Sequence, residues 1–234
     1  MKKKLTVIII FLVSLTAFAQ AGVNKYDAQG KRHGVWKGNY EDTKRMRYEG
    51  TFEHGKEKGV FKFYDNDENS TLMATRDFTT GNGTSVTVFY DAEGKKLSEG
   101  KEVNRLREGE WKFYHPGKTA IMSTEQYSEG ELTGTKKVYF PNGKIAETAE
   151  YKKGVRNGAY RKYTEEGVVL EESVYKNGKL HGPTVFRDGT GEVVSKGMYA
   201  NDLKTGIWQY FENGKLVKEK DKTNLKIELE RVRE

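Results

Sequence analysis

Residues 175–182 read Tyr-Lys-Asn-Gly-Lys-Leu-His-Gly, and this stretch holds both the turn and the spacing that decide the fold. Asn177-Gly178 is a strong hairpin signal, because both central positions of a type I′ turn need a positive φ. The same pair recurs at Asn142-Gly143 and Asn213-Gly214. Runs rich in aromatic and β-branched residues flank these turns, as is typical of short strands. The stretch therefore predicts a β-hairpin.

Two series of residues repeat in phase through the rest of the chain. A tyrosine followed seven residues later by a glycine recurs every 24 residues, at Tyr127, Tyr151, Tyr175 and Tyr199 with Gly134, Gly158, Gly182 and Gly206. This unit glycine continues backwards at Gly109, Gly59 and Gly34, and a second glycine series runs through Gly94, Gly117, Gly143, Gly167, Gly191 and Gly214. Such a period indicates a repeat architecture, and the repeat region lacks the 3.6-residue periodicity of helices. We predict an all-β fold, an elongated single-layer antiparallel meander of about eight 24-residue β-hairpin repeats over residues 20–220.

The composition indicates how such a sheet is held together. The chain has 26 Gly, 14 Tyr, 11 Phe and 3 Trp, and it is poor in the aliphatic residues that fill ordinary cores. A single hairpin is unstable in water, so neighbouring repeats must supply each other's buried surface. We expect the four tyrosines of the regular series to form one column across the sheet. Trp36, Trp111 and Trp208 each lie two residues after a unit glycine and form a second column.

The two ends of the chain differ from the repeats. Residues 1–19 combine three lysines, an apolar run and Ala17-Phe18-Ala19, which are the parts of a secretory signal peptide. The apolar run is shorter than the ~20 residues of a membrane span, and a retained anchor or a buried segment is the alternative. Residues 221–234 form a charged cap or tail whose apolar residues fit either a strand or one helix face. Both ends thus lie outside the array.

Charge and cysteine content exclude several functional classes. Loss of Lys2, Lys3 and Lys4 with the leader lowers the formal net charge from +7 to +4, and mixed charge of this size is not a nucleic-acid footprint. The chain has no cysteine, which excludes disulfides, thiol catalysis and zinc–thiolate sites. An exported chain of this kind must draw its stability from packing or repetition.

The repeat resembles a known family. Residues 175–182, together with Tyr139–Lys144 and Tyr210–Lys215, are similar to the bacterial variant of the MORN (membrane occupation and recognition nexus) repeat. The resemblance covers about residues 26–220, with a departure at 65–80. It implies a curved or twisted sheet of hairpins with a non-catalytic role as scaffold, oligomerising module or membrane-associated adaptor. Many bacterial proteins of this kind carry an antitoxin label.

The residues that often carry chemistry are assigned to structural roles. His33 and His181 occupy the same repeat position about six units apart, and His54 and His115 fall at turns, so no metal site is expected. The glycine-rich segment 81–85 lacks the third glycine and helix of a dinucleotide motif and the Gly-Lys-Ser/Thr of a P-loop. A single-layer sheet offers no deep cleft for paired carboxylates. We expect no cofactor and no enzymatic activity.

Two sets of exposed groups are candidates for binding. Lys144 and Lys215 follow turn glycines and fall on one edge of the predicted sheet, where they either meet anionic lipid or polysaccharide or are simply solvated. Trp36, Trp111 and Trp208 either hold hairpins together or grip a partner from the open face. We expect a non-catalytic scaffold, exported to the periplasm, cell envelope or medium, that binds a protein partner. The alternatives are an immunity or antitoxin-like protein that neutralises a toxin, and a peripheral binder of anionic lipid or polysaccharide.

Overall fold

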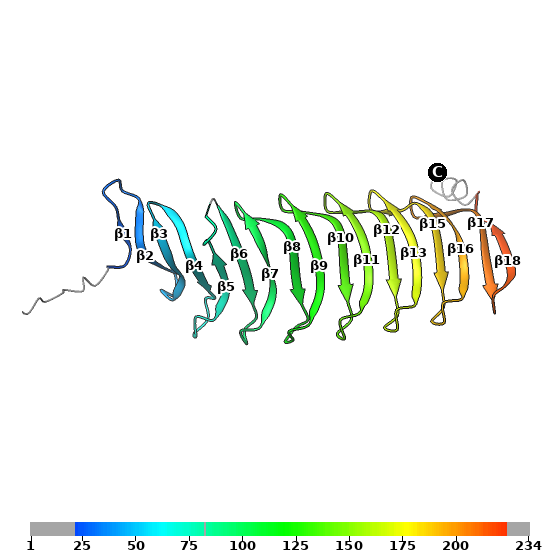
Figure 1. Ribbon diagram of the computed structural model, residues 1–234, viewed down its shortest axis with the longest axis horizontal. Coiled ribbons are helices and arrows are strands. Elements are labelled where there is room, and N and C mark those ends of the chain that lie inside the picture. The colour runs from blue at the N-terminus through cyan, green and yellow to red at the C-terminus, as the bar shows by residue number, and fades with distance from the viewer. Residues whose placement is uncertain (1–21, 82, 224–234) are drawn as a thin grey trace, which may run out of the picture.

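The computed structural model describes residues 22–81 and 83–223, and this part of the chain is one open antiparallel sheet. Figure 1 shows its strands lying across the long axis of an elongated molecule. The strands are β1 (Lys25–Tyr26), β2 (Arg32–Asn39), β3 (Met46–Glu53), β4 (Lys56–Tyr64), β5 (Leu72–Asp77), β6 (Thr84–Tyr90), β7 (Lys96–Val103), β8 (Leu106–Tyr114), β9 (Ile121–Ser128), β10 (Glu131–Tyr139), β11 (Ile145–Lys152), β12 (Val155–Tyr163), β13 (Val169–Lys176), β14 (Lys179–Leu180), β15 (Gly182–Arg187), β16 (Val193–Ala200), β17 (Leu203–Glu212) and β18 (Lys215–Asp221).

Each strand pairs with the strand that precedes it in the chain, and the short β14 and β15 share β13 as their partner. Successive turns therefore alternate between the two long edges of the sheet, as Figure 1 shows. We call the edge with turns 54–55, 104–105 and 153–154 the short-turn edge, and the edge with turns 91–95, 140–144 and 164–168 the long-turn edge. The predicted all-β hairpin meander is confirmed.

The unit glycines lie inside strands and not at the turns. Gly109, Gly134 and Gly158 have φ values of 71°, 62° and 128°, and each pairs with the tyrosine of the following strand. The ladder shifts register beside them, for example where Gly100 faces Trp111 and the next residue faces Glu108. A bulge of this kind needs a positive φ that only glycine adopts without a steric cost. The tyrosine and glycine series are thus one cross-strand unit.

The Asn-Gly turns fall into two types. Asn177 and Asn213 have φ values of 51° and 52° and precede glycines that also have positive φ, as a type I′ turn requires. Asn142-Gly143 was expected to do the same, but only Gly143 has a positive φ there. The residue before Asn142 is Pro141, whose own φ is fixed near −65°. The backbone N–H of Lys144 donates to Asn142 Oδ1 at 3.0 Å. This turn is therefore longer and belongs to the long-turn edge.

The irregular segment at 65–80 keeps the sheet continuous. The N–H of Asp65 donates to the carbonyl of Thr71 at 2.8 Å and closes a longer turn before β5. Phe78 then takes the place that tyrosine has in the regular units, because its N–H donates to the carbonyl of the unit glycine Gly59 at 2.9 Å. The aromatic spacing is thus stretched because the turn before β5 is longer and phenylalanine replaces tyrosine. The strand order is unchanged.

The buried side chains lie on one face of the sheet, along a row of paired residues that we call the central row and at positions two residues to either side of it. From β2 to β17 the row runs through Trp36, Gly50, Phe61, Arg76, Thr87, Gly100, Trp111, Glu125, Lys136, Ala149, Tyr160, Ser173, Thr184, Gly197 and Trp208. Trp111 and Trp208 are fully buried, although the sheet has one layer. We call this side the aromatic face.

Small residues in the row make that burial possible. The ring of Trp111 lies over Gly100, where an added Cβ would stand 2.4 Å from the indole, and Trp208 covers Gly197 in the same way. Tyr160 is paired with Ala149, which is 1% exposed. A ring that covers a small residue on the next strand excludes water from that backbone. The core of this protein is therefore a line of rings laid across small residues.

Among the described residues no helix has the length and hydropathy of a membrane span. The predicted signal peptide at 1–19 and most of the predicted cap or tail at 221–234 lie outside the described residues; Asp221 ends β18.

Candidate functional site

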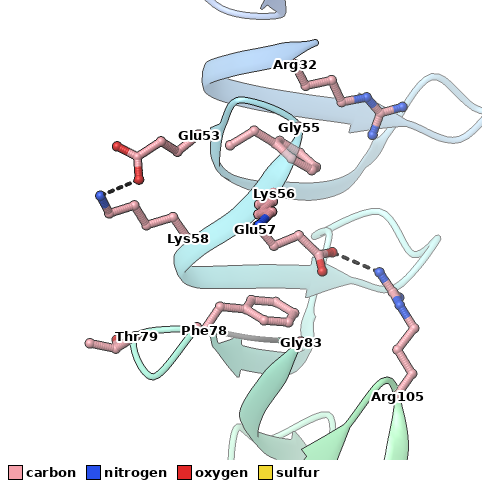
Figure 2. Close-up of a pocket in the computed structure, with 12 residues that line it drawn as sticks. Arg32, Glu53, Gly55, Lys56, Glu57, Lys58, Phe78, Thr79, Gly83 and Arg105 are labelled. Atoms are coloured by element: carbon pink, nitrogen blue, oxygen red, sulfur yellow. Dashed lines mark hydrogen bonds and ion pairs between the residues drawn. The ribbon is translucent and has the colours of Figure 1, made fainter.

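A groove lies at the N-terminal end of the aromatic face. It consists of two adjoining cavities of about 730 and 430 Å³. Both are lined by Arg32, Phe52, Glu57 and Arg105, and Figure 2 shows Glu57 and Arg105 paired beside the ring of Phe78. We call this region, over β2 to β5 and the turn at 104–105, the N-terminal groove.

The floor of the N-terminal groove is a cluster of aromatic rings. Trp36, Phe52, Phe61 and Phe78 are all buried and form one hydrophobic cluster. The Phe52 and Phe61 centroids are 5.1 Å apart in an edge-to-face arrangement, and the Phe61 and Phe78 centroids are 5.5 Å apart in the same arrangement. Such pairs add about 0.5–1.5 kcal/mol each beyond the area they bury. The floor is thus rigid and apolar.

Two arginines from distant parts of the chain flank this floor. The Arg32 guanidinium lies 4.7 Å from the Trp36 centroid and 5.2 Å from that of Phe52. Arg105 comes from the turn between β7 and β8, with a φ of 68°, and donates to Glu57 Oε1 at 2.8 Å. In the described part of the chain Arg32 has no carboxylate partner, whereas Arg105 has one. Arg47 lines the second cavity 5.6 Å from the Tyr48 centroid and likewise has no carboxylate partner among the described residues. The groove therefore offers two guanidinium groups, of Arg32 and Arg47, that are free of an ion pair and lie over aromatic rings.

The cation above a ring is itself a repeated feature. Arg107 lies 4.5 Å from the Trp111 centroid, Arg156 lies 5.1 Å from that of Tyr160, and Lys204 Nζ lies 3.8 Å from that of Trp208. Each of these cations precedes a unit glycine by two residues, as Arg32 does. Cation–π contacts of this kind contribute about 0.5–2 kcal/mol each. Outside the N-terminal groove, each of these cations lies over a central-row ring that has a tyrosine beside it.

Tyrosine–carboxylate pairs stabilise the face opposite the rings. Burial, together with a 2.8 Å hydrogen bond from its hydroxyl to Glu49, raises the pKa of Tyr64 to about 12. Burial and the same kind of bond to Glu99 raise the pKa of Tyr114 to about 12. Both carboxylates neighbour a row glycine, Gly50 or Gly100, and adjacent strand residues point to opposite faces. The two carboxylates therefore lie on the opposite face, while Tyr64 also lines the smaller cavity of the N-terminal groove.

The structure places the three predicted tryptophans in structural positions. Trp36 is 7% exposed, while Trp111 and Trp208 are fully buried. Each indole N–H donates to a backbone carbonyl, for example that of Trp111 to Lys101 at 3.0 Å. Of the two alternatives, these rings fit the one in which they hold hairpins together, and a partner cannot grip them without opening the sheet.

The four predicted tyrosines share one register position, because each pairs with the unit glycine of the preceding strand. Tyr127 contacts Trp111 at 6.5 Å between centroids, Tyr175 contacts Tyr160 at 5.7 Å, and Tyr199 contacts Trp208 at 5.2 Å. Tyr151 bonds through its hydroxyl to Arg156 at 3.3 Å. The tyrosines therefore form a column beside the central row that holds the tryptophans, and rings of the two columns contact each other across adjacent strands. The unit glycines Gly134, Gly158 and Gly182 face Tyr151, Tyr175 and Tyr199, and Gly206, with a φ of 64°, ends the series.

The two predicted lysines lie at the long-turn edge and far from the N-terminal groove. Lys144 ends the turn before β11 and Lys215 begins β18, and both are exposed. The structure places them on the same edge, as the alternation of turns predicts.

The sequence reasoning did not identify the lining of the N-terminal groove. Arg32, Phe52, Glu57, Phe78 and Arg105 come from four repeats, and the Glu57–Arg105 pair joins residues 48 apart. One signal was available: a cation two residues before the unit glycine recurs together with a ring two residues after it, at 32 and 36, 107 and 111, 156 and 160, and 204 and 208. That pairing predicts a cation above each of those rings.

Comparison with known proteins supports the repeat type over part of the chain. Residues 132–153 and 156–177 match the family described as "MORN repeat variant". The two segments run from β10 to β13, where tyrosine and unit glycine are most regular. The chain thus contains MORN-type repeats in its central part. No curated protein matches the chain.

Solved structures give only a weak likeness. The "Crystal structure of GtfA/B complex" is 13% identical over 38% of this chain and 18% of that one, with a TM-score of 0.29. The S. aureus TarM G117R mutant in complex with fondaparinux, alpha-GlcNAc-glycerol and UDP is 14% identical over 53% of this chain and 19% of that one, with a TM-score of 0.23. The chain therefore spans about a fifth of each of these structures. Likeness at these scores supports no inference about function.

Proposed function

We propose that this protein is a non-catalytic repeat scaffold, exported to the cell envelope, that binds a protein partner through the N-terminal groove. The observation that carries the proposal is the groove itself, an apolar floor of rings flanked by Arg32 and Arg105. Rings and arginines are the residues that most often dominate the energy of protein–protein interfaces. The composition of residues 1–19 supports export.

The chemistry of the groove favours an acidic segment of the partner. Arg32 presents a guanidinium that no described carboxylate neutralises, and its position over two rings keeps it fixed. A carboxylate accepts two parallel hydrogen bonds from a guanidinium, which gives both energy and orientation. Apolar side chains next to that carboxylate would cover Phe52 and Phe78. We therefore infer a partner segment that alternates acidic and apolar residues.

A capture experiment with matched variants tests the binding site. The mature chain is immobilised and exposed to envelope fractions, and the captured proteins are compared with those held by Arg32→Gln, by Arg105→Gln and by Arg161→Gln. Arg161 is the control, because it is exposed and pairs with Glu172 at 3.1 Å outside the groove. We expect one protein to be captured by the wild type and by the control, and lost at least tenfold from the Arg32 variant. Equal capture by the wild type and all three variants would show that the N-terminal groove is not the binding site.

The long-turn edge supports a second candidate, a peripheral binder of anionic lipid or polysaccharide. Lys144 and Lys215 are exposed on the same edge, and a cation near an anionic surface contributes about 1 kcal/mol. Pelleting with phosphatidylserine vesicles separates this candidate from the first. The double change Lys144→Glu and Lys215→Glu would abolish pelleting if the edge binds lipid, and leave capture of the protein partner unchanged. Neutralisation of a toxin would appear as a captured partner whose toxicity the chain suppresses.

A further inference from the structure

Three side chains with metal-binding atoms meet at the short-turn edge, beside but not within the N-terminal groove. Asp27 lies in the turn before β2, His33 lies on β2, and His54 lies in the turn between β3 and β4. One carboxylate oxygen and one nitrogen from each imidazole all lie within 4.8 Å of one another. Neither histidine lines the cavities of the groove, so the proposed partner site does not account for this cluster.

The carboxylate of Asp27 is held in place by the main chain. Its Oδ1 accepts the N–H groups of Gln29 at 3.0 Å and Lys31 at 2.8 Å, while its Oδ2 lies 2.7 Å from His54 Nδ1. The side chain is only 8% exposed. The backbone bond from Lys31 and the contact with His54 lower the pKa of this carboxyl, which keeps it ionised. One oxygen is thus committed to the turn and the other is directed toward the imidazoles.

The two imidazoles lie together on the outer side of that carboxylate. Their ring centroids are 4.8 Å apart at an angle of 44°. The turn that carries His54 is fixed against β2, because the N–H of Gly55 donates to the carbonyl of Arg32 at 2.8 Å. The His54 side chain is 63% exposed, so solvent reaches the cluster and an ion has a way in.

We propose that Asp27, His33 and His54 bind one Zn²⁺ ion. Two imidazole nitrogens and a carboxylate oxygen are ligands that Zn²⁺ accepts, with water as the fourth ligand. Ligands at about 2.0–2.1 Å in a tetrahedron lie roughly 3.4 Å apart, so the observed separations of 2.7 to 4.8 Å need only small side-chain rotations. The backbone bonds to the other oxygen of Asp27 supply the outer support that metal ligands need.

The ion would join the first two hairpins of the array. β1 has two residues and few contacts of its own, so the turn that holds Asp27 depends on its neighbours. A terminal repeat lacks a partner on one side and needs a cap. A metal bridge from this turn to the β3–β4 turn provides one. The histidines then have a role beyond the turn and surface positions that the sequence predicts for them, because His33 and His54 belong to consecutive repeats and meet at one edge.

Calorimetric titration of the mature chain with zinc chloride tests the proposal, after removal of any affinity tag. We expect one saturable site at micromolar zinc and an affinity at least tenfold weaker in His33→Ala, in His54→Ala and in Asp27→Asn. His181→Ala is the matched control, since His181 also precedes a unit glycine, and among the described residues no other group of three metal-binding side chains is present. This control should bind zinc like the wild type.

Two further readouts separate ligation from folding. Cobalt bound to the wild type should show the visible absorption of a four-coordinate site, and the absorption should be missing from the double variant His33→Ala, His54→Ala. Zinc should raise the melting temperature of the wild type and leave that of the double variant unchanged, while circular dichroism shows the same sheet in both. No saturable zinc binding, or binding that survives the double variant, would overturn the proposal.

Discussion

The two ends of the aromatic face are filled in different ways, although the repeat length is the same. In the N-terminal part, rings of the central row stand on every second strand, with Trp36 on β2 and Phe61 on β4. From β8 onward the next rings are Trp111, Tyr160 and Trp208, and four ladder positions separate each from the next. The first arrangement gives one continuous cluster of buried rings, whereas in the second the row rings are spaced more widely, and each has a tyrosine beside it and a cation above it.

Polar pairs occupy the central row between these more widely spaced rings. Glu125 and Lys136 form an ion pair at 2.7 Å between the rings of Trp111 and Tyr160. Nearer the groove, Arg76 pairs with Glu102 at 2.9 Å, and the hydroxyl of Thr87 donates to the same carboxylate. The strand period is therefore 24 residues, while the period of the rings is about twice that. Dense rings form the groove floor, and alternating rings are enough to hold the sheet.

Replacement of a central-row ring in mid-array should have the largest effect on stability. Trp111→Ala removes a fully buried ring and should lower the free energy of unfolding by about 4 kcal/mol. Trp36→Ala should cost less, about 2–3 kcal/mol, because that ring is 7% exposed and its strand β2 is flanked on one side only by the two-residue strand β1. Urea unfolding of both variants measures the difference. Equal losses would show that position in the array does not change the cost.

The small residues under the rings should be nearly as sensitive. Gly100→Val places side-chain atoms where an added Cβ already stands 2.4 Å from the indole, so Trp111 must leave its site, at a cost of about 3 kcal/mol. Gly189→Ala is the control, since the space around Gly189 is open, and it should change stability by less than about 0.5 kcal/mol. Urea unfolding and tryptophan fluorescence report both effects. A Gly100 variant with wild-type fluorescence would contradict the placement of the Trp111 ring over Gly100.

The strand order could be predicted because it rests on local signals. Type I′ turns at Asn177 and Asn213 need positive φ at two adjacent residues, and the sequence marks this with Asn-Gly. The cross-strand match of Tyr151 with Gly134 follows from one period repeated without error. The departure at Asn142 was also readable, since the proline before it sets φ. The turns and the cross-strand register of hairpin repeats can be predicted from the sequence, because each unit contacts mainly its neighbours.

The composition of the two sites could not be predicted, because it depends on how bulges set the register. A shift beside each unit glycine decides which residues share the central row, and one residue of error would move every side chain to the other face. The pairing of Glu57 with Arg105 joins residues 48 apart across three intervening strands, so no local pattern marks it. His33 and His54 lie 21 residues apart, whereas the repeat is 24 residues long. They therefore occupy different positions in their repeats, and the repeat pattern does not predict that they meet.

The cations above the rings should have a moderate effect that differs between the two regions. Arg107 covers Trp111, Phe113 and Tyr127 and donates to the Tyr127 hydroxyl at 3.0 Å. Arg107→Gln should therefore lower stability by about 1 kcal/mol, as thermal and urea unfolding will show. Arg32→Gln, which loses contacts to two rings in a larger cluster, should change stability less and partner capture more. The reverse order would indicate that Arg32 is structural.

The smallest effect is expected on the face where the two regions are alike, because Tyr64 with Glu49 and Tyr114 with Glu99 make the same contact. A tyrosine whose pKa is about 12 in the fold and about 10 unfolded contributes stability that is complete below pH 10 and disappears as the pH rises to 12. In Glu49→Gln and Glu99→Gln the tyrosine stays buried but loses its anionic partner. Ultraviolet titration of tyrosinate should therefore show one tyrosine in each variant ionising at lower pH than in the wild type. A lower ionisation pH in only one of the two variants would show that the two regions differ on this face of the sheet as well.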